Sequence, residues 1–181
     1  MKRWSMVLLV LVFICSMFLA LGQAEEKYPS RPVELVVPMA PGGSSDLLAR
    51  IFSEELSRVL KVPINVVNRA GGSGVQAVTH VTRAKKDGYT LFEGTSTSIS
   101  IMPSFSKEAN YDPIKEFIPI GHFASVPSII SVRSDSPFQT LNDLIEYARK
   151  SPGKLKNSCV GFGEVSYLNL QLLSAGNNIK I

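Results

Sequence analysis

Residues 33–46 read VELVVPMAPGGSSD, and this stretch decides the fold. The apolar, valine-rich residues 33–37 predict a β-strand, since they are bounded by prolines on both sides. Residues 41–43 (PGG) predict a turn, and the Ser-Ser-Asp of residues 44–46 is typical of a helix start. The apolar residues that follow fall on one helical stripe: Leu47, Leu48, Ile51, Phe52, Leu56, Val59 and Leu60. The stretch therefore predicts a strand, a glycine-rich turn and an amphipathic helix.

The same unit returns further along the chain. Residues 64–67 predict a second strand, residues 68–74 (NRAGGSG) a second glycine-rich turn, and residues 75–83 a second helix. Residues 89–93 predict a third strand, which leads into the small, hydroxyl-rich loop 94–100 (GTSTSIS). Because parallel strands need a crossover, strands that alternate with helices indicate an α/β fold with a mostly parallel sheet.

The texture of the sequence changes after residue 110, where the apolar runs become short. Gly161-Phe162-Gly163 predicts a third glycine-rich turn. The other elements expected here are strands at 117–123, 128–132 and 156–160, and helices at 140–150 and 166–175. We therefore expect two α/β domains, at residues 25–110 and 111–181, of which the second is partial.

The first 24 residues have the three parts of a secretory signal peptide. A basic start is followed by the apolar run 6–21, and Gly22-Gln23-Ala24 offers small residues at a cleavage site. The alternative is an uncleaved membrane anchor, but the run is shorter than the ~20 residues that span a bilayer. We expect cleavage near Ala24 and a periplasmic protein.

Charge and cysteine content exclude several classes of protein. The chain has 181 residues, with 19 basic and 15 acidic side chains. Removing residues 1–24 removes Lys2 and Arg3 and no acid, so 17 against 15 leaves a net charge of +2. No basic stripe is present, and we expect no nucleic-acid partner. Cys159 would then be the one remaining cysteine, which cannot form an internal disulfide.

Catalytic and metal-binding patterns are also weak. His80 and His122 have no partner at metal-ligand spacing, so we expect neither a metal nor a cofactor. The sequence contains no GxSxG motif, and we expect no catalytic residues. A secreted hydrolase is a remote alternative.

The glycine-rich turns are the best candidates for a binding site. In an open α/β sheet such turns lie at the carboxyl ends of the strands, where ligands bind. Helix N-termini there present free N–H groups and a positive dipole end, and glycine lets a ligand approach the backbone. No GxxxxGK[ST] spacing favours phosphate, so the turns suit a small carboxylate. The other interpretation is that each turn is an ordinary connection.

The sequence resembles a known receptor family at this point. Residues 28–33 (YPSRPV), then 36–46 (VVPMAPGGSSD) and Ala49-Arg50, resemble the start of the mature substrate-binding receptors of tripartite tricarboxylate transporters, also called Bug receptors. Further similar pieces follow in order: Val67-Asn68-Arg69 with Gly71 and Gly74, 87–91 (DGYTL), 111–113 (YDP) with Phe117, 151–155 (SPGKL), and Ser158 with Gly161 and Gly163.

The resemblance implies a periplasmic-binding-protein-like receptor of the Venus-flytrap kind, a monomer without catalysis. It implies capture of a small organic acid (a dicarboxylate, tricarboxylate, amino acid or aromatic acid) and delivery to the permease subunits of the transporter. The first two turns would hold one carboxylate through backbone N–H groups and water, while the third turn and the loop after residue 93 would close over it. The implied site residues are Gly42, Gly43, Ser44, Ser45, Asp46, Gly71, Gly72, Gly74, Thr95, Ser96, Ser158, Gly161 and Gly163.

Two departures from the family pattern affect these expectations. Glu164 replaces a small residue in the third turn, and a carboxylate repels an acidic ligand. Glu164 therefore either faces solvent or meets a ligand amine. The family's chains continue past residue 181, so we expect an incomplete second domain and, as an alternative function, a truncated, binding-impaired receptor fragment.

Overall fold

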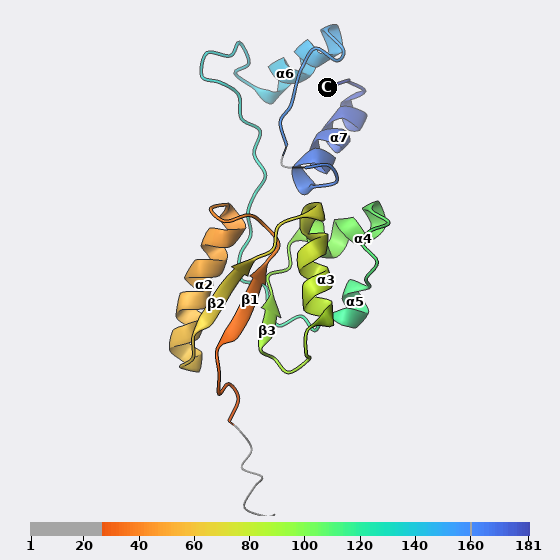
Figure 1. The fold of residues 1–181 in the computed structure, drawn as a ribbon. Helices are drawn as coiled ribbons and strands as arrows, with labels where there is room; N and C mark the ends of the chain where they lie inside the picture. The colour runs from red at the N-terminus through yellow and green to blue at the C-terminus, as the bar shows by residue number, and fades with distance from the viewer. Residues whose placement is uncertain (1–26, 160) are drawn as a thin grey trace, which may run out of the picture. The chain divides into compact units, whose positions relative to one another are not determined.

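A computed structural model describes residues 27–159 and 161–181, and the predicted signal peptide lies outside this range. Its sheet has three parallel strands, β1 (Val33–Val37), β2 (Ile64–Asn68) and β3 (Thr90–Phe92). They lie in the order β2-β1-β3, with β1 in the centre (Figure 1). The three strands predicted before residue 100 and their parallel pairing are thereby confirmed.

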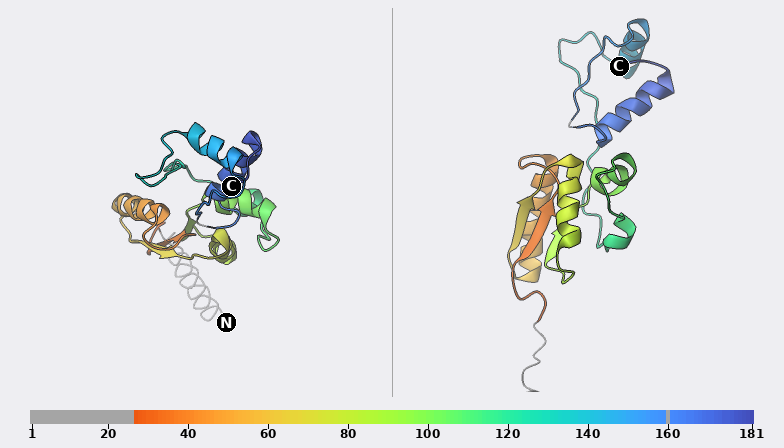
Figure 2. Two further views of the ribbon diagram at one scale, coloured as in Figure 1. Left: turned by 90° about the horizontal axis from the view of Figure 1, so that it is seen from above. Right: turned by 45° about the vertical axis from the view of Figure 1, so that its right-hand side comes forward.

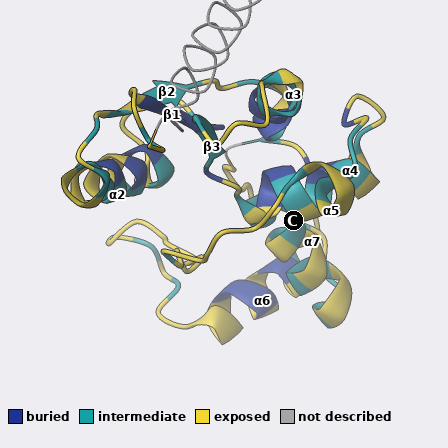
Figure 3. Ribbon diagram, turned by 90° about the horizontal axis from the view of Figure 1, so that it is seen from below, coloured by how far each residue is buried: buried dark blue, intermediate teal, exposed yellow. Residues whose placement is uncertain are grey.

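Two helices cover this sheet, and chain topology decides which face each one takes. Helix α2 (Ser44–Leu60) connects β1 to β2, and helix α3 (Val75–Arg83) connects β2 to β3. Crossover connections between parallel strands are right-handed. The connection from β1 to β2 moves toward one side of the sheet, and the connection from β2 to β3 moves back past β1 toward the other side. The two helices therefore lie on opposite faces of the sheet (Figure 3).

The core is centred on β1, which is buried on both faces. Val33, Val36 and Val37 have no exposed surface. Leu35 packs on the α2 side against Ala49 of the helix, with half-buried apolar neighbours around them. A central parallel strand covered by helices on both faces is a near-continuous apolar run, which explains the four apolar residues of β1. Glu34 is the exception, and its carboxylate lies 3.2 Å from His80 Nε2.

The predicted apolar stripe of α2 is only partly correct. Leu47, Ile51 and Val59 are exposed, whereas the small residues Ala49 and Ser53 are buried. Ala49 packs with Leu35 and Val37 of β1, and the half-buried Phe52 packs against the same cluster. The stripe therefore contributes its half-buried members to the core, while the exposed ones do not take part.

The remainder of the chain contains short helices before the two predicted ones. A π-helical turn at Thr97–Ile101 runs into α4 (Met102–Phe105), and α5 covers Pro113–Glu116. Helices α6 (Leu141–Lys150) and α7 (Val165–Asn177) confirm the helices predicted at 140–150 and 166–175. Within the described residues no helix has the length and apolar character to cross a membrane.

Helix α6 begins with a capping box. The backbone N–H of Asp143 donates to the Thr140 hydroxyl at 3.2 Å, and the Thr140 N–H donates to the Asp143 carboxylate at 2.8 Å. These hydrogen bonds lower the pKa of Asp143 below its ordinary value. The side chains of Thr140 and Asp143 thus accept two backbone N–H groups that have no partner within the helix. This reciprocal pairing explains why the sequence of residues 140–143 predicts the helix start.

The strands predicted at 117–123, 128–132 and 156–160 are wrong within the residues that the structure describes, since no strand follows β3 there and residue 160 lies outside them. Ile118, Ile120 and Ile129 are 89%, 84% and 81% exposed. A strand needs a neighbour that takes its backbone hydrogen bonds and a layer that covers its apolar face. In the described part of the chain these segments have no strand partner. Phe117 and Phe123 pack on the rings of Phe92 and Phe52, but the three isoleucines remain uncovered.

The position of Leu35 in the core leads to the first prediction. Leu35→Ala removes a buried side chain between the sheet and α2, and should lower the free energy of unfolding by about 2–5 kcal/mol. Urea unfolding followed by circular dichroism measures the change. The matched control is Leu172→Ala on an exposed position of α7, which should change it by less than about 0.5 kcal/mol. Equal losses in both variants would contradict the assigned core.

Candidate functional site

The candidate site lies where the three strands end. The arrowheads of β1, β2 and β3 point in the same direction, so the carboxyl ends of the three strands lie at the same end of the sheet (Figures 1 and 2). The chain leaves β1 toward β2 on one side and later returns to β3 on the other, so the direction of winding reverses at β1. Open α/β sheets bind ligands outside the strand ends at this kind of switch point.

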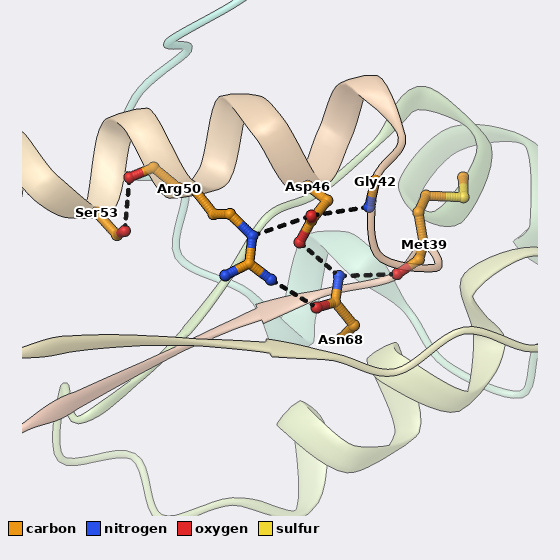
Figure 4. A network of polar contacts seen from close by, with 6 residues as sticks. All are labelled: Met39, Gly42, Asp46, Arg50, Ser53 and Asn68. Atoms are coloured by element: carbon orange, nitrogen blue, oxygen red, sulfur yellow. Dashed lines mark hydrogen bonds and ion pairs between the residues drawn. The ribbon is translucent and has the colours of Figure 1, made fainter.

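A buried carboxylate ties the first turn to the second. One oxygen of Asp46, Oδ2, accepts hydrogen bonds from the Gly42 N–H at 2.9 Å and from Arg50 Nε at 3.0 Å. The other, Oδ1, accepts one from Asn68 Nδ2 at 2.9 Å, and the same amide nitrogen donates to the Met39 carbonyl at 3.1 Å (Figure 4). The end of β2, the turn after β1 and the first turn of α2 are thus joined by one side chain.

This environment keeps Asp46 ionised. The hydrogen bond from Arg50, followed by those from the Gly42 backbone and Asn68, holds the pKa of Asp46 well below its ordinary value. The residue is 3% exposed, and its oxygens already accept three donors. Of its two interpretations from the sequence, a helix-dipole partner and an acceptor for a ligand amine or water, the geometry favours a charge that serves the fold and positions the turn.

The start of α2 is left open by its N-cap residue. Gly43 precedes Ser44 and has no side chain with which to cap the helix, and Gly42 has a φ of +88°. The N–H groups in the first turn of α2 therefore receive no side-chain cap, and the positive end of the helix dipole lies with them. A carboxylate is the kind of group that satisfies both.

The second turn owes its shape to glycine. Gly71, Gly72 and Gly74 all have positive φ, of +136°, +56° and +98°. Gly74 is buried, and a Cβ atom there would lie 2.8 Å from the Ser98 Cβ and 3.2 Å from the Pro38 Cβ. The segments that follow all three strands therefore approach one another at Gly74, and a side chain at this position would separate them.

The loop after β3 is fixed by its own hydroxyl groups. The Thr95 N–H donates to Ser98 Oγ at 3.1 Å, and the Ser98 N–H donates to Thr95 Oγ1 at 3.2 Å. Tyr111 also donates from its hydroxyl to the Ser98 carbonyl at 2.5 Å. Thr95 is half-buried within this turn, whereas Ser96 is exposed. Of this predicted pair, Ser96 is therefore the more exposed residue.

The third turn meets the second. Ser73 Oγ donates a long hydrogen bond of 3.5 Å to the Phe162 carbonyl, and Gly161 lies beside the same hydroxyl. The ring of Phe162 packs against that of Phe105 with centroids 5.0 Å apart. Gly163 has a φ of +77°, and a Cβ atom there would lie 2.5 Å from the Phe105 ring. Glycine is therefore required at the closing edge of this turn.

Ser158 and Glu164 flank the third turn. Ser158 is exposed and, in the described part of the chain, makes no hydrogen bond with the other predicted site residues. Glu164, expected to face solvent or a ligand amine, instead caps α7 by accepting the Ser166 N–H at 2.9 Å. Its negative charge is used at a helix N-terminus.

Glu93 is the residue that the sequence patterns missed. It directly follows β3, and its N–H donates to the Val36 carbonyl at 2.9 Å, so the ladder still holds it. Side chains alternate along a strand, which places Glu93 on the same face as Leu91, the face covered by α2. The sequence does hold a signal for this residue, because a charged side chain two positions after the apolar Leu91 falls on the same, buried face of the strand.

Glu93 is an unusual carboxyl group for this position. It is 6% exposed, and among the described residues Oε2 has no hydrogen-bond partner. Burial raises the pKa of Glu93 to about 7, the Ser45 side chain lowers it in part, and the Asp46 charge raises it. The positive end of the α2 dipole also favours the ionised carboxylate and so lowers the pKa of Glu93. Its contribution of about 0.3–1 kcal/mol corresponds to less than one pKa unit.

Metal-binding clusters do not form among residues 27–159 and 161–181, where no group of three His, Cys, Asp or Glu side chains is placed to hold an ion. His80 Nε2 instead lies 3.2 Å from Glu34 Oε1, on the sheet. His122 lies next to the Ser125 hydroxyl at 3.4 Å. The site is therefore composed of turns, helix ends and two acidic side chains.

Comparison with known proteins now identifies the family. Residues 48–181 match the model of the tripartite tricarboxylate transporter family receptor. The chain belongs to this receptor family. Its fold and its family are those of solute-binding receptors.

Individual relatives of this chain agree with that assignment. A UPF0065 protein from the tcbD-tcbE intergenic region of Pseudomonas sp. (strain P51) is 35% identical over 88% of this chain and 47% of its own length. The structure of R. palustris Rpa4515 with adipate superposes with a TM-score of 0.80 and 33% identity, over 85% of this chain and 52% of that one. MatC from Rhodopseudomonas palustris with bound malate gives 0.70 and 31%, over 84% and 52%. The chain spans about half the length of the curated relatives it matches.

The Asp46 network leads to a prediction with a defined pH dependence. Asp46→Asn removes the charge that Arg50 and the Gly42 N–H bind, and should lower the free energy of unfolding at pH 7 by about 1–3 kcal/mol. The folded-state pKa lies below the ordinary 3.8, so the contribution is present above 3.8 and lost as the pH falls below it. Urea unfolding between pH 2 and 7 measures both effects.

The matched control is Asp135→Asn, which breaks an exposed ion pair with Arg133. It should cost about 0–1 kcal/mol at pH 7, since water screens such pairs. A deficit of the Asp46→Asn variant that grows as the pH falls would contradict the assigned role of Asp46.

Proposed function

We propose that this chain is an extracytoplasmic solute-binding receptor that captures a small organic carboxylate and delivers it to a permease of the tripartite tricarboxylate type, without catalysing a reaction. The observation that carries the proposal is the uncapped start of α2 at the switch point of the sheet. The Asp46 network fixes it against the second turn. Family membership supports the same function.

The proposed mechanism of capture relies on backbone donors. The N–H groups of the first and second turns bind one carboxylate of the ligand, directly or through water, while Asp46 holds the first turn in place. The loop after β3 and the third turn contribute from the other side. The proposed ligand-binding residues are Gly42, Gly43, Ser44, Ser45, Gly71, Gly72, Gly74, Thr95, Ser96, Ser158, Gly161 and Gly163.

The proposed ligand class is a dicarboxylate. One related structure contains adipate and another contains malate, and both ligands carry two carboxylates. Backbone N–H groups at a helix start recognise the carboxylate group and not the rest of the molecule. One end of a dicarboxylate would therefore be held at α2, and the identity of the acid would depend on what surrounds its other end.

The proposed setting is the periplasm. The sequence pattern of residues 1–24 supports export with cleavage near Ala24. We propose that the receptor acts as a monomer, that residues 25–110 and 111–181 belong to two α/β domains, and that its partners are the membrane permease subunits.

The proposed function predicts stabilisation by acids. Adipate, malate, aspartate and benzoate are each added to the purified protein, and the unfolding temperature is measured. A bound acid at a hundredfold excess over its Kd should stabilise the fold by about 2.7 kcal/mol. Adipamide, which keeps the chain of adipate but lacks its charges, is the control and should have no effect. Failure of all four acids, or equal effects of adipate and adipamide, would contradict the proposal.

The geometry of the first turn gives a second test of the function. Gly42→Ala places a side chain at a φ of +88°, which costs about 1–2 kcal/mol for an L-residue and should displace the turn and its donors. We expect the Kd for adipate to rise about tenfold, a loss near 1.4 kcal/mol. The control is Gly121→Ala, because Gly121 lies outside the left-handed region with open space around it. Calorimetry of both variants decides, and equal Kd values would contradict the role of the turn.

A further inference from the structure

Glu93 is a buried group that the proposed capture mechanism does not use. It follows β3 at the switch point, on the face of the sheet that α2 covers. It is more than nine-tenths buried, and one carboxyl oxygen has no partner in the described residues. A buried polar atom without a partner is costly, and it calls for an explanation such as a missing ligand.

The surroundings of Glu93 are acidic on the side of the helix. From α2, Ser45 interacts with its carboxyl group and the ionised Asp46 lies near it. Arg50 is engaged by Asp46 at 3.0 Å, so this guanidinium does not neutralise Glu93. From the sheet, β1 contributes the Val36 carbonyl, which already accepts the Glu93 N–H. No cation offsets a charge on Glu93 in this part of the described structure.

We infer that Glu93 binds the acid in its protonated form, donating a hydrogen bond from its carboxyl group to a carboxylate of the ligand, so that capture of the anion takes up a proton. This inference rests on the proposed function, and it adds a specificity-determining residue to the same site. Only the protonated group can donate, and an O–H donor to a carboxylate makes a short, strong bond. An ionised Glu93 would repel the ligand.

The proton balance follows from the two states of the free receptor. Below the pKa of Glu93, about 7, the site already holds its proton, and binding takes up none. Above it, free Glu93 is ionised, and each acid bound must bring one proton from solution. The affinity for a dicarboxylate should therefore change little near pH 6, where the ligand itself is still ionised, and fall about tenfold per pH unit above pH 7.

Calorimetry of adipate binding tests this directly. Titrations at pH 6 and pH 8, each in two buffers with different heats of ionisation, count the protons exchanged. We expect about zero at pH 6 and nearly one taken up at pH 8. Binding with a pH-independent Kd and no uptake at pH 8 would overturn the inference and leave the proposed function intact. Failure of adipate and malate to bind at either pH would overturn both.

The variant Glu93→Gln keeps the size of the side chain and a hydrogen-bond donor but removes the group that titrates. Its amide can donate where the protonated acid does, so the Kd at pH 6 should stay within a fewfold of the wild type, while the pH dependence and proton uptake disappear. The control Glu116→Gln, on an exposed residue of α5, should keep both. A Glu93→Gln variant that still takes up a proton would overturn the inference. So would binding of aspartate that strengthens as the pH rises, which indicates an ionised Glu93 paired with an ammonium group.

The protonation of Glu93 in the ligand-free protein can be tested separately, through the pH dependence of the unfolding free energy. The folded-state pKa of Glu93 is raised from 4.5, so its favourable protonated form is fully present below 4.5 and is lost as the pH rises through about 7. The unfolding free energy of the wild type should therefore fall relative to that of Glu93→Gln between pH 5 and 8. A constant difference over this range would overturn the inference.

Discussion

The ionised carboxylate of Asp46 is the interaction on which the site depends. Its three donors come from the turn after β1, from the next turn of α2 and from the end of β2. Gly42 and Arg50 each lie four positions from Asp46, whereas Asn68 lies twenty-two positions away and approaches it only in the folded chain. A buried carboxylate without donors would be costly, so the network holds the segments in one arrangement. Because the acceptors are occupied, the groups left to face an anion are backbone N–H donors.

An anion site can contain acidic residues only if their charges are satisfied or suppressed, and three acids near the turns illustrate both ways. Asp46 is saturated with donors and keeps its charge. Glu164 interacts with the N-terminus of α7, where its carboxylate accepts the Ser166 N–H. Glu93 has too few partners, and burial favours its neutral form. The local environment of each carboxyl group, and not the number of acids, therefore determines whether the site attracts a carboxylate.

Local patterns predicted well, and patterns that depend on distant partners did not. The strand at 33–37, the helix at 75–83 and the Thr140 cap follow from residues within a few positions of one another. The strands expected at 117–123 and 128–132 required pairing partners that a short apolar run cannot specify. The glycine-rich turns could also be predicted, and their glycines at Gly42, Gly71, Gly72, Gly74 and Gly163 have positive φ. The network of Asp46 with Asn68 could not be predicted, because twenty-two positions separate the two and only the sheet register brings them together.

Glu93 shows how topology turns an ordinary position into a site. With the order β2-β1-β3 and α2 starting after β1, the residue that follows β3 on the α2 face must lie under the first turn of that helix. A leucine there would continue the cluster around Leu35 and Leu91 and would stabilise the fold. The carboxyl group instead carries a burial cost of about 1–3 kcal/mol for its unpartnered oxygen, in a fold whose total stability is about 5–15 kcal/mol. Nothing in the described residues offsets that cost, whereas a carboxylate bound at the start of α2 would supply the missing acceptor.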